Sequence, residues 1–472
     1  MYKRVRQIIR MFLNVAGASL LFLVASAILL IACNCRDAPL PDLSGLEPVP
    51  GANVPANSNG WYCIREAVRD SWIPARTASL YAVWCGVRRE DAAGLRELLA
   101  SNTLALAWID RAANSAWIAP PRVYLPEDGN WLGWSPVARC GRTLRLRAEL
   151  ALAEGRTNDA LRDYGQSLRL ARLYLECSPV GEPDALAAFV EVRNVLHAVR
   201  DASERLGVRV VWERFGDDLR VLSDLREPRR RASAAALSAD RRELARLGRM
   251  ASGVETPPAN LNSPFDSIFP DDATRAAGIW PERLAIGALN LLPVSYRLQP
   301  NRTLAIMAGV RRGGPLPASV LLAVDARRSS SWMKLLNPAW RLLGPNGLGE
   351  IYIIIQSERQ KFIEGGARLA ECGARGTRLA LALRLYEQEH GELPERLDAL
   401  VPVWIEAVPV DPYDGQSFRY HRVRRLVYSI GPNRRDDGGS RDDVLFPVAT
   451  RFATEARANP RAEGLAGARP SM

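Results

Sequence analysis

The sequence predicts a mainly α-helical protein with a small α+β module near its C-terminus, and three observations support this fold class. Residues 11–32 form an apolar run without a charge, residues 61–250 carry a helical pattern, and two alternating stretches follow a helix after residue 367. A chain of 472 residues corresponds to about three domains. The predicted segments are 1–35 (membrane anchor or signal segment), 36–60 (linker), 61–250 (helical domain), 251–364 (irregular linker region), 365–450 (α+β module) and 451–472 (disordered tail).

The composition is that of a folded protein in which arginine supplies nearly all the positive charge. Apolar residues make up 47% of the chain and charged residues 24%, which excludes a wholly disordered or polytopic membrane protein. The net charge is +11, yet the chain contains only three lysines. No GxxxxGK[ST] sequence occurs, which excludes a P-loop, and three scattered histidines do not supply a histidine-rich zinc site.

The N-terminal apolar run predicts a membrane-spanning helix. At 1.5 Å per residue, residues 11–32 form a helix of roughly 33 Å, which crosses a hydrocarbon core of about 30 Å. Basic residues precede the run, so the positive-inside rule predicts a single pass through a bacterial inner membrane, with a cytoplasmic N-terminus and a periplasmic bulk. Leu30-Ile31-Ala32-Cys33 is similar to a lipobox, so a lipoprotein acylated at Cys33 is one alternative and a cleaved signal peptide is another.

Export of the chain determines the expected partners. We expect membrane lipid around the N-terminal helix and an unknown envelope protein as a further partner. Nucleic acid is not expected, because four of the eleven net positive charges lie in the first 33 residues. The exported part contains six cysteines, which permit up to three disulfides or pack as reduced apolar side chains.

Residues 61–250 carry the periodicity of successive helical hairpins. Val137 to Glu154 is rich in good helix formers, and Gly155 then occupies the position of a C-terminal cap. Thr157 or Asn158 can cap the next helix, in which apolar residues recur at three and four residue steps. The segment RAELALAEGRTNDALRDYGQSLRLARLY is similar to one tetratricopeptide-type hairpin, which implies a protein-binding surface. Further helices are predicted over 184–204, 208–225 and 229–247.

The C-terminal module combines a helix with an antiparallel hairpin. A helix is predicted over Ala367 to His390, and strands over Ser417 to Arg422 and Arg424 to Ile430. The segment LALRLYEQEHGELPERLDALVPVWIEAVPVDPYDGQSFRYHR, followed by LVYSIGPNRRDDGG, resembles the periplasmic part of the major pseudopilins of type II secretion. The whole chain is similar to uncharacterised bacterial envelope proteins that carry this module.

The resemblance to pseudopilins implies a calcium site in the acidic loop after the last predicted strand. Several pseudopilins bind calcium there, and the residues that match are Asn433, Asp437 and Asp443. Calcium takes six to eight oxygen ligands, which a glycine-rich loop with clustered carboxylates can supply. The residues themselves favour a solvated acidic turn whose carboxylates are neutralised by neighbouring arginines; calcium, which the resemblance implies, is the alternative and the one candidate cofactor.

No catalytic motif is complete, so no catalytic residue is assigned. Ser331 to Lys334 fits SxxK, but the accompanying SDN and KTG motifs are missing. An arginine run between 229 and 249 indicates a solvated helix face paired with local acids, or a contact with an anionic polymer.

We predict a non-enzymatic, membrane-anchored envelope protein that acts as a scaffold or protein-interaction factor. The alternative is an envelope hydrolase or a cell-wall glycan binder that uses the tryptophan-rich region, where seven tryptophans lie between Trp61 and Trp134. Converging carboxylates in a pocket would favour the hydrolase, and an exposed row of tryptophans would favour the glycan binder.

Overall fold

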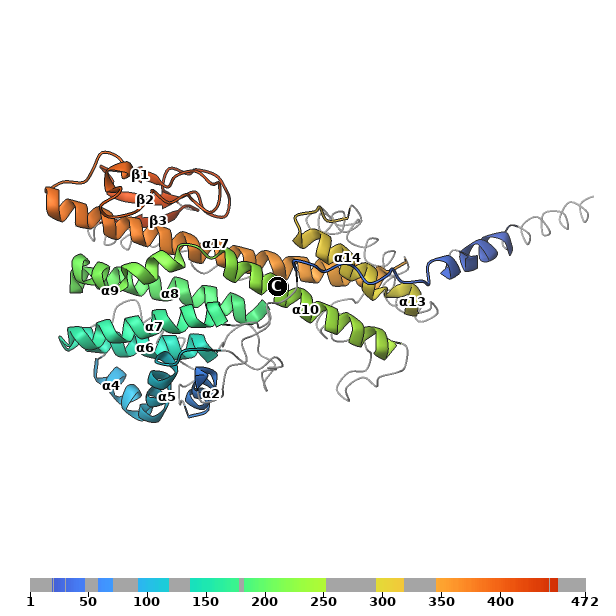
Figure 1. Cartoon of the computed structure of the whole chain (residues 1–472), viewed down its shortest axis with the longest axis horizontal. Coiled ribbons are helices and arrows are strands. Elements are labelled where there is room, and N and C mark those ends of the chain that lie inside the picture. The colour runs from blue at the N-terminus through green and yellow to red at the C-terminus, as the bar shows by residue number, and fades with distance from the viewer. Residues whose placement is uncertain are drawn as a thin grey trace, which may run out of the picture. The chain divides into compact units, whose positions relative to one another are not determined.

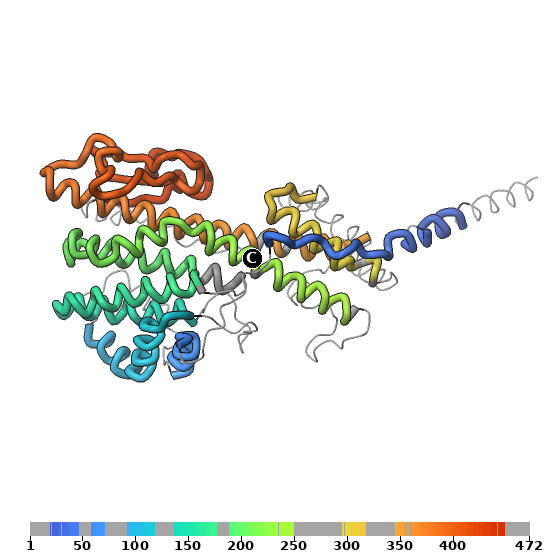
Figure 2. The backbone as a smooth tube through the Cα atoms, viewed as in Figure 1, coloured from blue at the N-terminus to red at the C-terminus, as the bar shows by residue number. Residues whose placement is uncertain are grey.

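The computed structural model of the chain is mainly helical and carries a small antiparallel sheet, which confirms these two parts of the predicted fold class (Figure 1; Figure 2). It describes residues 19, 21–29, 31–46, 58–70, 92–118, 136–177, 182–251, 294–317, 345–440 and 442–448. The chain divides into two compact units, each built from two separated stretches of sequence. The first unit comprises Met1–Glu47 and Ser233–Gln360, and the second comprises Pro48–Ala232 and Lys361–Met472.

The predicted N-terminal membrane helix is corrected by the structure. Among the residues described, no helix is both long enough and apolar enough to cross a membrane. The helical residues described here lie between 19 and 33, so they span about 22 Å at 1.5 Å per residue, against a hydrocarbon core of about 30 Å. Residues 1–18 lie outside the described part. This finding contradicts the predicted transmembrane helix and signal anchor. It also contradicts the inner-membrane localisation that was inferred from them.

Three helices contribute to the core of the first unit. They are the second part of α10 (Arg226–Ala251), α14 (Pro300–Arg311) and the first part of α17 (Gly347–His390). Leu298, which follows the short helix α13 (Val294–Arg297), also belongs to this core. Leucines of α10 and α14 pack there against Leu348 and Tyr352 of α17. Inside this core, Asp240 accepts hydrogen bonds from Arg311 and from the Tyr352 hydroxyl, both at 2.9 Å. One buried carboxylate therefore links α10, α14 and α17.

The region 251–364, predicted to be an irregular linker, contains three of these helical segments. Pro300 is among the first residues of α14, where a missing N–H leaves no intrahelical hydrogen bond unmade. Asn346 stands just before α17, and its Oδ1 accepts the Gln299 N–H at 2.8 Å. Pro300 and Asn346 thus stand at helix starts, whereas Gly313 to Pro317, part of the pattern that suggested irregular chain, follow the end of α14. Residues 252–293 and 318–344 lie outside the described part of this region.

Residues 36–46 of the predicted linker 36–60 lie against α14 instead of extending freely. The Asp37 carboxylate accepts the backbone N–H groups of Asn301 at 2.8 Å and Arg302 at 3.1 Å, so it caps the helix from a distant point in the sequence. Arg312 donates to the carbonyl oxygen of Asp42 at 2.8 Å. Side-chain caps of this kind leave no periodic signal in the sequence.

Seven helices described in the second unit precede α10. They are α2 (Gly60–Asp70), α4 (Ala92–Ser101), α5 (Thr103–Ala113), α6 (Pro136–Ala153), α7 (Thr157–Cys177), α8 (Glu182–Leu206) and α9 (Val208–Leu222). The predicted hairpin is observed as α6 and α7, joined through Gly155, whose φ of +77° favours glycine. Helices α6 to α9 follow one another side by side (Figure 1). The helices predicted over 184–204, 208–225 and 229–247 correspond to α8, α9 and α10.

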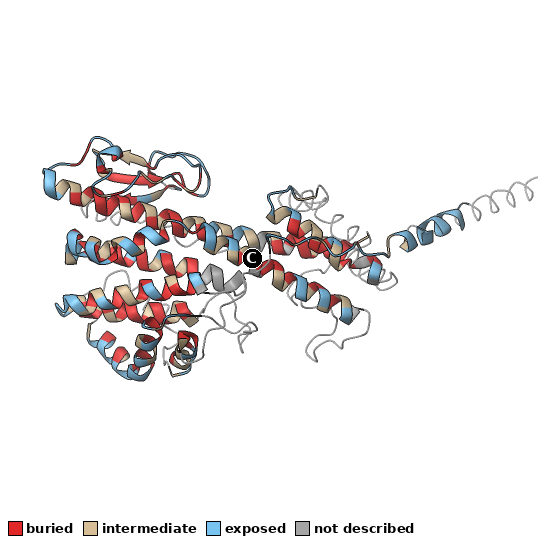
Figure 3. Ribbon diagram, in the orientation of Figure 1, coloured by how far each residue is buried: buried red, intermediate tan, exposed pale blue. Residues whose placement is uncertain are grey.

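The part of helix α17 in the second unit carries many buried residues, and they belong to two cores (Figure 3). Ala367, Ala370 and Ala374 belong to the same core as α6 to α9. Leu379 and Leu383 belong to the core beneath the sheet. The helical residues 61–232 and the C-terminal module therefore share a central helix.

The sheet lies on α17 and has the strand order β1-β2-β3, all antiparallel. Its strands are β1 (Arg419–His421), β2 (Leu426–Ser429) and β3 (Val444–Pro447). Strands β1 and β2 fall within the two predicted strands, whereas β3 was not predicted. Phe446 of β3 packs so closely over Gly376 of α17 that a Cβ atom at this position would overlap its ring.

A buried ion pair joins α6 to α8 in the core of the second unit. The side chains of Arg145 and Glu191 are 2% and 1% exposed. They form a bidentate ion pair, in which Nη2 of Arg145 donates to Oε2 of Glu191 at 3.2 Å. Arg145 also donates to the Ser167 hydroxyl of α7 at 3.2 Å. Gly141, one turn earlier in α6, makes room for the Glu191 carboxylate, which a Cβ atom there would overlap.

Candidate functional site

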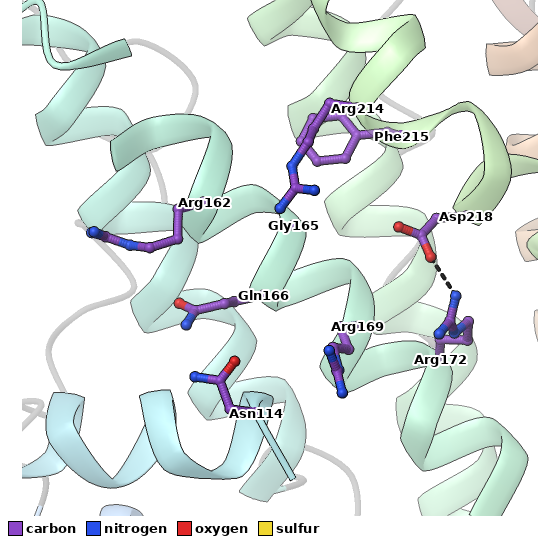
Figure 4. Close-up of a pocket in the computed structure, with 9 residues that line it drawn as sticks. All are labelled: Asn114, Arg162, Gly165, Gln166, Arg169, Arg172, Arg214, Phe215 and Asp218. Carbon is purple, nitrogen blue, oxygen red and sulfur yellow. Dashed lines mark hydrogen bonds and ion pairs between the residues drawn. The ribbon is translucent and has the colours of Figure 1, made fainter. Parts of the chain in front are cut away.

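A cavity of about 310 Å³ lies between α5, α7 and α9 in the second unit (Figure 4). Its lining residues come from the end of α5 and from one face each of α7 and α9. They are Asn114, Arg162, Gly165, Gln166, Arg169, Arg172, Arg214, Phe215 and Asp218. The lining thus combines four arginines with one carboxylate, so its formal charge is strongly positive.

Helical spacing explains why α7 supplies most of this lining. Arg162, Gly165 and Arg169 follow one another at steps of three and four residues, which places them on one face of the helix. Other positions around the helix carry core residues such as Leu168 and Tyr164, which are fully buried. The same periodicity that fixes α7 in the core therefore turns its arginines toward the cavity.

Arg147 of α6 holds α5 beside α7. It donates to Asp110 of α5 at 2.6 Å and to Asp163 of α7 at 2.7 Å. Burial alone would lower the pKa of the Arg147 guanidinium, but its hydrogen bonds to these two carboxylates raise it on balance. Arg147 stays charged and binds both carboxylates. It therefore holds α5 and α7, which both line the cavity, next to each other.

The absence of a side chain at Gly165 brings α9 close to α7. A Cβ atom at this position would lie 3.4 Å from Cε1 of Phe215 and 3.6 Å from Nη2 of Arg214. Figure 4 shows Arg214 extending from α9 toward Gly165. Gly165 thus leaves room for a guanidinium group above the backbone of α7.

The four arginines differ in how far their charge is already neutralised. Arg162 pairs with Asp159 at 3.0 Å, and Arg172 pairs with Asp218 at 2.5 Å. Arg169 donates instead to the Ser115 carbonyl oxygen at 3.3 Å. Within the part of the chain that the structure describes, neither Arg169 nor Arg214 forms an ion pair with a carboxylate. Two guanidinium groups at one cavity are therefore available to an anion.

The chemistry of this lining suits an anionic ligand. The planar guanidinium group matches the geometry of carboxylate and phosphate and can donate two parallel hydrogen bonds to either. Asn114 and Gln166 add amide groups, which both donate and accept hydrogen bonds. The volume is at the lower end of the range of ligand pockets, roughly 300 to 1,000 Å³.

This cavity was not predicted from the sequence, in which the arginine run 229–249 of α10 is the more conspicuous pattern. There, Glu227 pairs with Arg230 at 2.9 Å and with Arg231 at 3.0 Å, while Glu243 pairs with Arg246 at 2.7 Å. The pattern that indicates the cavity is the set of arginines on one face of α7. That pattern does not show that residues of α9 also line the cavity.

The predicted calcium residues lie in the loop between β2 and β3. The Asn433 amide donates to Asp437 Oδ2 at 3.0 Å, so these two side chains meet. The Asp443 carboxylate is buried and accepts the backbone N–H groups of Gly439 at 2.7 Å and Ser440 at 3.3 Å. Across the described residues, no group of three or more His, Cys, Asp or Glu side chains is placed to hold a metal. Calcium at this loop stays a prediction.

Calcium binding predicts a higher melting temperature for the whole chain in millimolar calcium than in EGTA. Binding to the folded state at a hundredfold excess over Kd stabilises it by about 2.7 kcal/mol. At about 1 to 2 °C per kcal/mol for a unit of this size, this corresponds to roughly 3 to 5 °C. Asp437→Ala should remove the difference. Asp398→Ala, in the short helix η4 (Leu397–Leu400), is the control and should retain it. Identical melting curves for the wild type would show that hydrogen bonds alone organise the loop.

The described tryptophans do not form an exposed row. Trp61 is 2% exposed and stacks against Tyr174, and Trp108 donates to Asp70 at 3.2 Å from a partly buried position. Trp117 is exposed. The other four tryptophans of the region, and the SxxK sequence at 331–334, lie outside the described residues.

Comparison with known proteins yields no relative for this chain: neither a protein-family model, nor a curated protein, nor a solved structure matches it. The resemblances to pseudopilins and to a tetratricopeptide-type hairpin therefore rest on sequence motifs.

Proposed function

We propose that this chain is a non-enzymatic protein-interaction factor whose arginine-lined cavity binds an acidic segment of a partner protein. The observation that carries the proposal is the pair Arg169 and Arg214, which line one cavity from two helices without a carboxylate partner among the described residues. A carboxylate of the partner would supply the missing acceptor. Because a guanidinium group binds carboxylate through two parallel bonds, both arginines favour this chemistry.

A protein segment is favoured as ligand by the rest of the lining. Asn114 and Gln166 stand beside the arginines and can hydrogen-bond to the N–H and C=O groups of an extended peptide. The cavity lies on stacked helices whose α6–α7 hairpin is similar to a protein-binding repeat. Acidic side chains on a peptide would therefore meet both charged and amide groups.

The lining does not support the hydrolase alternative. Glycoside hydrolysis requires two carboxyl groups that flank the bond to be broken. This cavity contains a single carboxylate, that of Asp218, which already pairs with Arg172. Within the lining, the groups for acid–base catalysis are therefore missing, whereas those for anion binding are present.

Binding of a labelled, glutamate-rich peptide to the whole chain, followed by fluorescence anisotropy, tests the proposal. Arg169→Gln and Arg214→Gln should each weaken binding about tenfold, since a hydrogen bond to a charged group contributes roughly 1.5 to 3 kcal/mol and solvent reduces this at an exposed site. The same peptide with glutamine in place of glutamate should bind to neither the wild type nor the variants.

Arg220→Gln is the matched control for this experiment. Arg220 is an exposed arginine on the same helix as Arg214, pairs with Asp217 at 3.5 Å, and is not part of the lining. Its loss should leave the affinity for the acidic peptide unchanged. Unaltered binding by the Arg169→Gln/Arg214→Gln double variant, or equal weakening by Arg220→Gln, would contradict the proposed site.

A further inference from the structure

We infer that Asp218 sets the ligand class of the cavity, so that it accepts the single charge of an acidic side chain in preference to the double charge of a phosphorylated one. The inference rests on the proposed function and narrows its ligand. Asp218 places a negative charge inside a site for anions, and this charge repels the ligand.

Asp218 is held in this position by the fold. It belongs to α9, one turn after Arg214, and its Oδ1 accepts from Nη1 of Arg172 on α7 at 2.5 Å. The two side chains are 25% and 31% exposed, so their charges act on the cavity from a partly desolvated position. Figure 4 shows the pair at one side of the cavity, with Arg169 beside it. Among the described residues, Arg169 and Arg214 are then the two lining arginines without a carboxylate partner.

The effect of Asp218 depends on the charge of the ligand. Attraction to the cavity, and repulsion by Asp218, grow in proportion to the ligand charge. The free energy required to remove the ligand from water grows approximately as the square of that charge in a Born description. A site with a weaker positive field therefore favours a singly charged ligand over a doubly charged one. Asp218 weakens the field in this way, both by its own charge and by engaging Arg172.

A pair of matched competitors measures this preference in the whole chain. Both are capped peptides that are neutral except at one position, which is glutamate in the first and phosphoserine in the second. Each displaces the labelled glutamate-rich peptide, and the ratio of their inhibitory concentrations is the readout. The wild type should prefer the glutamate peptide. In Asp218→Asn, the relative affinity for the phosphoserine peptide should rise by on the order of fivefold to tenfold.

Two further variants separate the charge of Asp218 from other effects. Asp218→Glu retains the charge and should retain the wild-type preference. Asp217→Asn removes a carboxylate from the neighbouring position, where it is 95% exposed and outside the lining, and should leave the ratio unchanged. A melting curve for each variant verifies that it is folded.

The outcomes distinguish this inference from the function on which it rests. If the wild type binds the glutamate-rich peptide but the ratio is the same in Asp218→Asn, or if the wild type already prefers phosphoserine, the role of Asp218 is wrong and the acidic-segment site stands. If the wild type binds no acidic peptide, the proposed function fails and this inference fails with it.

Discussion

Glu191→Ala is expected to lower the free energy of unfolding by about 3 to 5 kcal/mol, because it leaves the Arg145 guanidinium without its carboxylate in a buried position. Burial raises the pKa of Glu191 and Arg145 opposes this shift, so the two residues stabilise each other only as a pair. Urea denaturation of the whole chain, followed by circular dichroism, measures the loss. The transition of the second unit should move to a lower urea concentration.

Two comparisons identify the cause of that loss. Asp159→Ala removes a solvent-accessible carboxylate of α7 that pairs with Arg156, just before the helix, and with Arg162. It should change stability by less than about 1 kcal/mol. Arg145→Met combined with Glu191→Met removes both charges and should be more stable than Glu191→Ala, because no unpaired charge stays buried. If Glu191→Ala behaves like Asp159→Ala, the core pair does not carry the expected energy.

The second large effect is expected for Asp411→Ala, which should destabilise the C-terminal sheet by about 4 kcal/mol. Asp411 is fully buried at the turn before β1. Its carboxylate accepts the Ser429 hydroxyl at 2.9 Å and the backbone N–H groups of Tyr413 and Ile430, each at 3.0 Å. Alanine would leave these three donors without an acceptor in the protein interior, and each buried donor without a partner costs about 1 to 3 kcal/mol.

Hydrogen exchange resolves the location of this effect. In Asp411→Ala, the amides of β2 should exchange much faster than in the wild type, whereas those of α6 and α7 should change less. Asp414→Ala is the control: Asp414 belongs to the same turn but is partly exposed and pairs with Arg419 at 2.5 Å, so it should leave β2 protected. Unchanged protection of β2 in Asp411→Ala would contradict the role of the buried carboxylate.

The sequence could predict those elements whose apolar residues recur with a clear period. Helices α8, α9 and α10 lie within a few residues of their predicted ranges, because each presents a long apolar stripe to the core. Strand β3 was missed because Val444–Pro447 is short and ends in proline, which is typical of a loop. The first part of α17 was missed because the preceding prolines and glycines favoured an irregular segment.

The candidate site could be predicted only in part, for a different reason. The arginines of α7 follow a helical step that is visible in the sequence, so their common face could have been recognised. That Arg214 and Asp218 of α9 lie across from them depends on the packing of α7 against α9 around Gly165 and Phe215. No local sequence pattern shows how α7 packs against α9. Nor does such a pattern show which of the lining arginines have no carboxylate partner among the described residues.

The position of α17 between the helices and the sheet has a consequence for synthesis on the ribosome. Residues 361–390 supply part of the core of the second unit, but they follow α9 only after the whole stretch Ser233–Gln360. At 5 to 20 residues per second, translation of that stretch takes roughly 6 to 26 s. During this delay the apolar faces of α6 to α9 lack their final cover, so the nascent chain offers chaperones a defined period in which to bind.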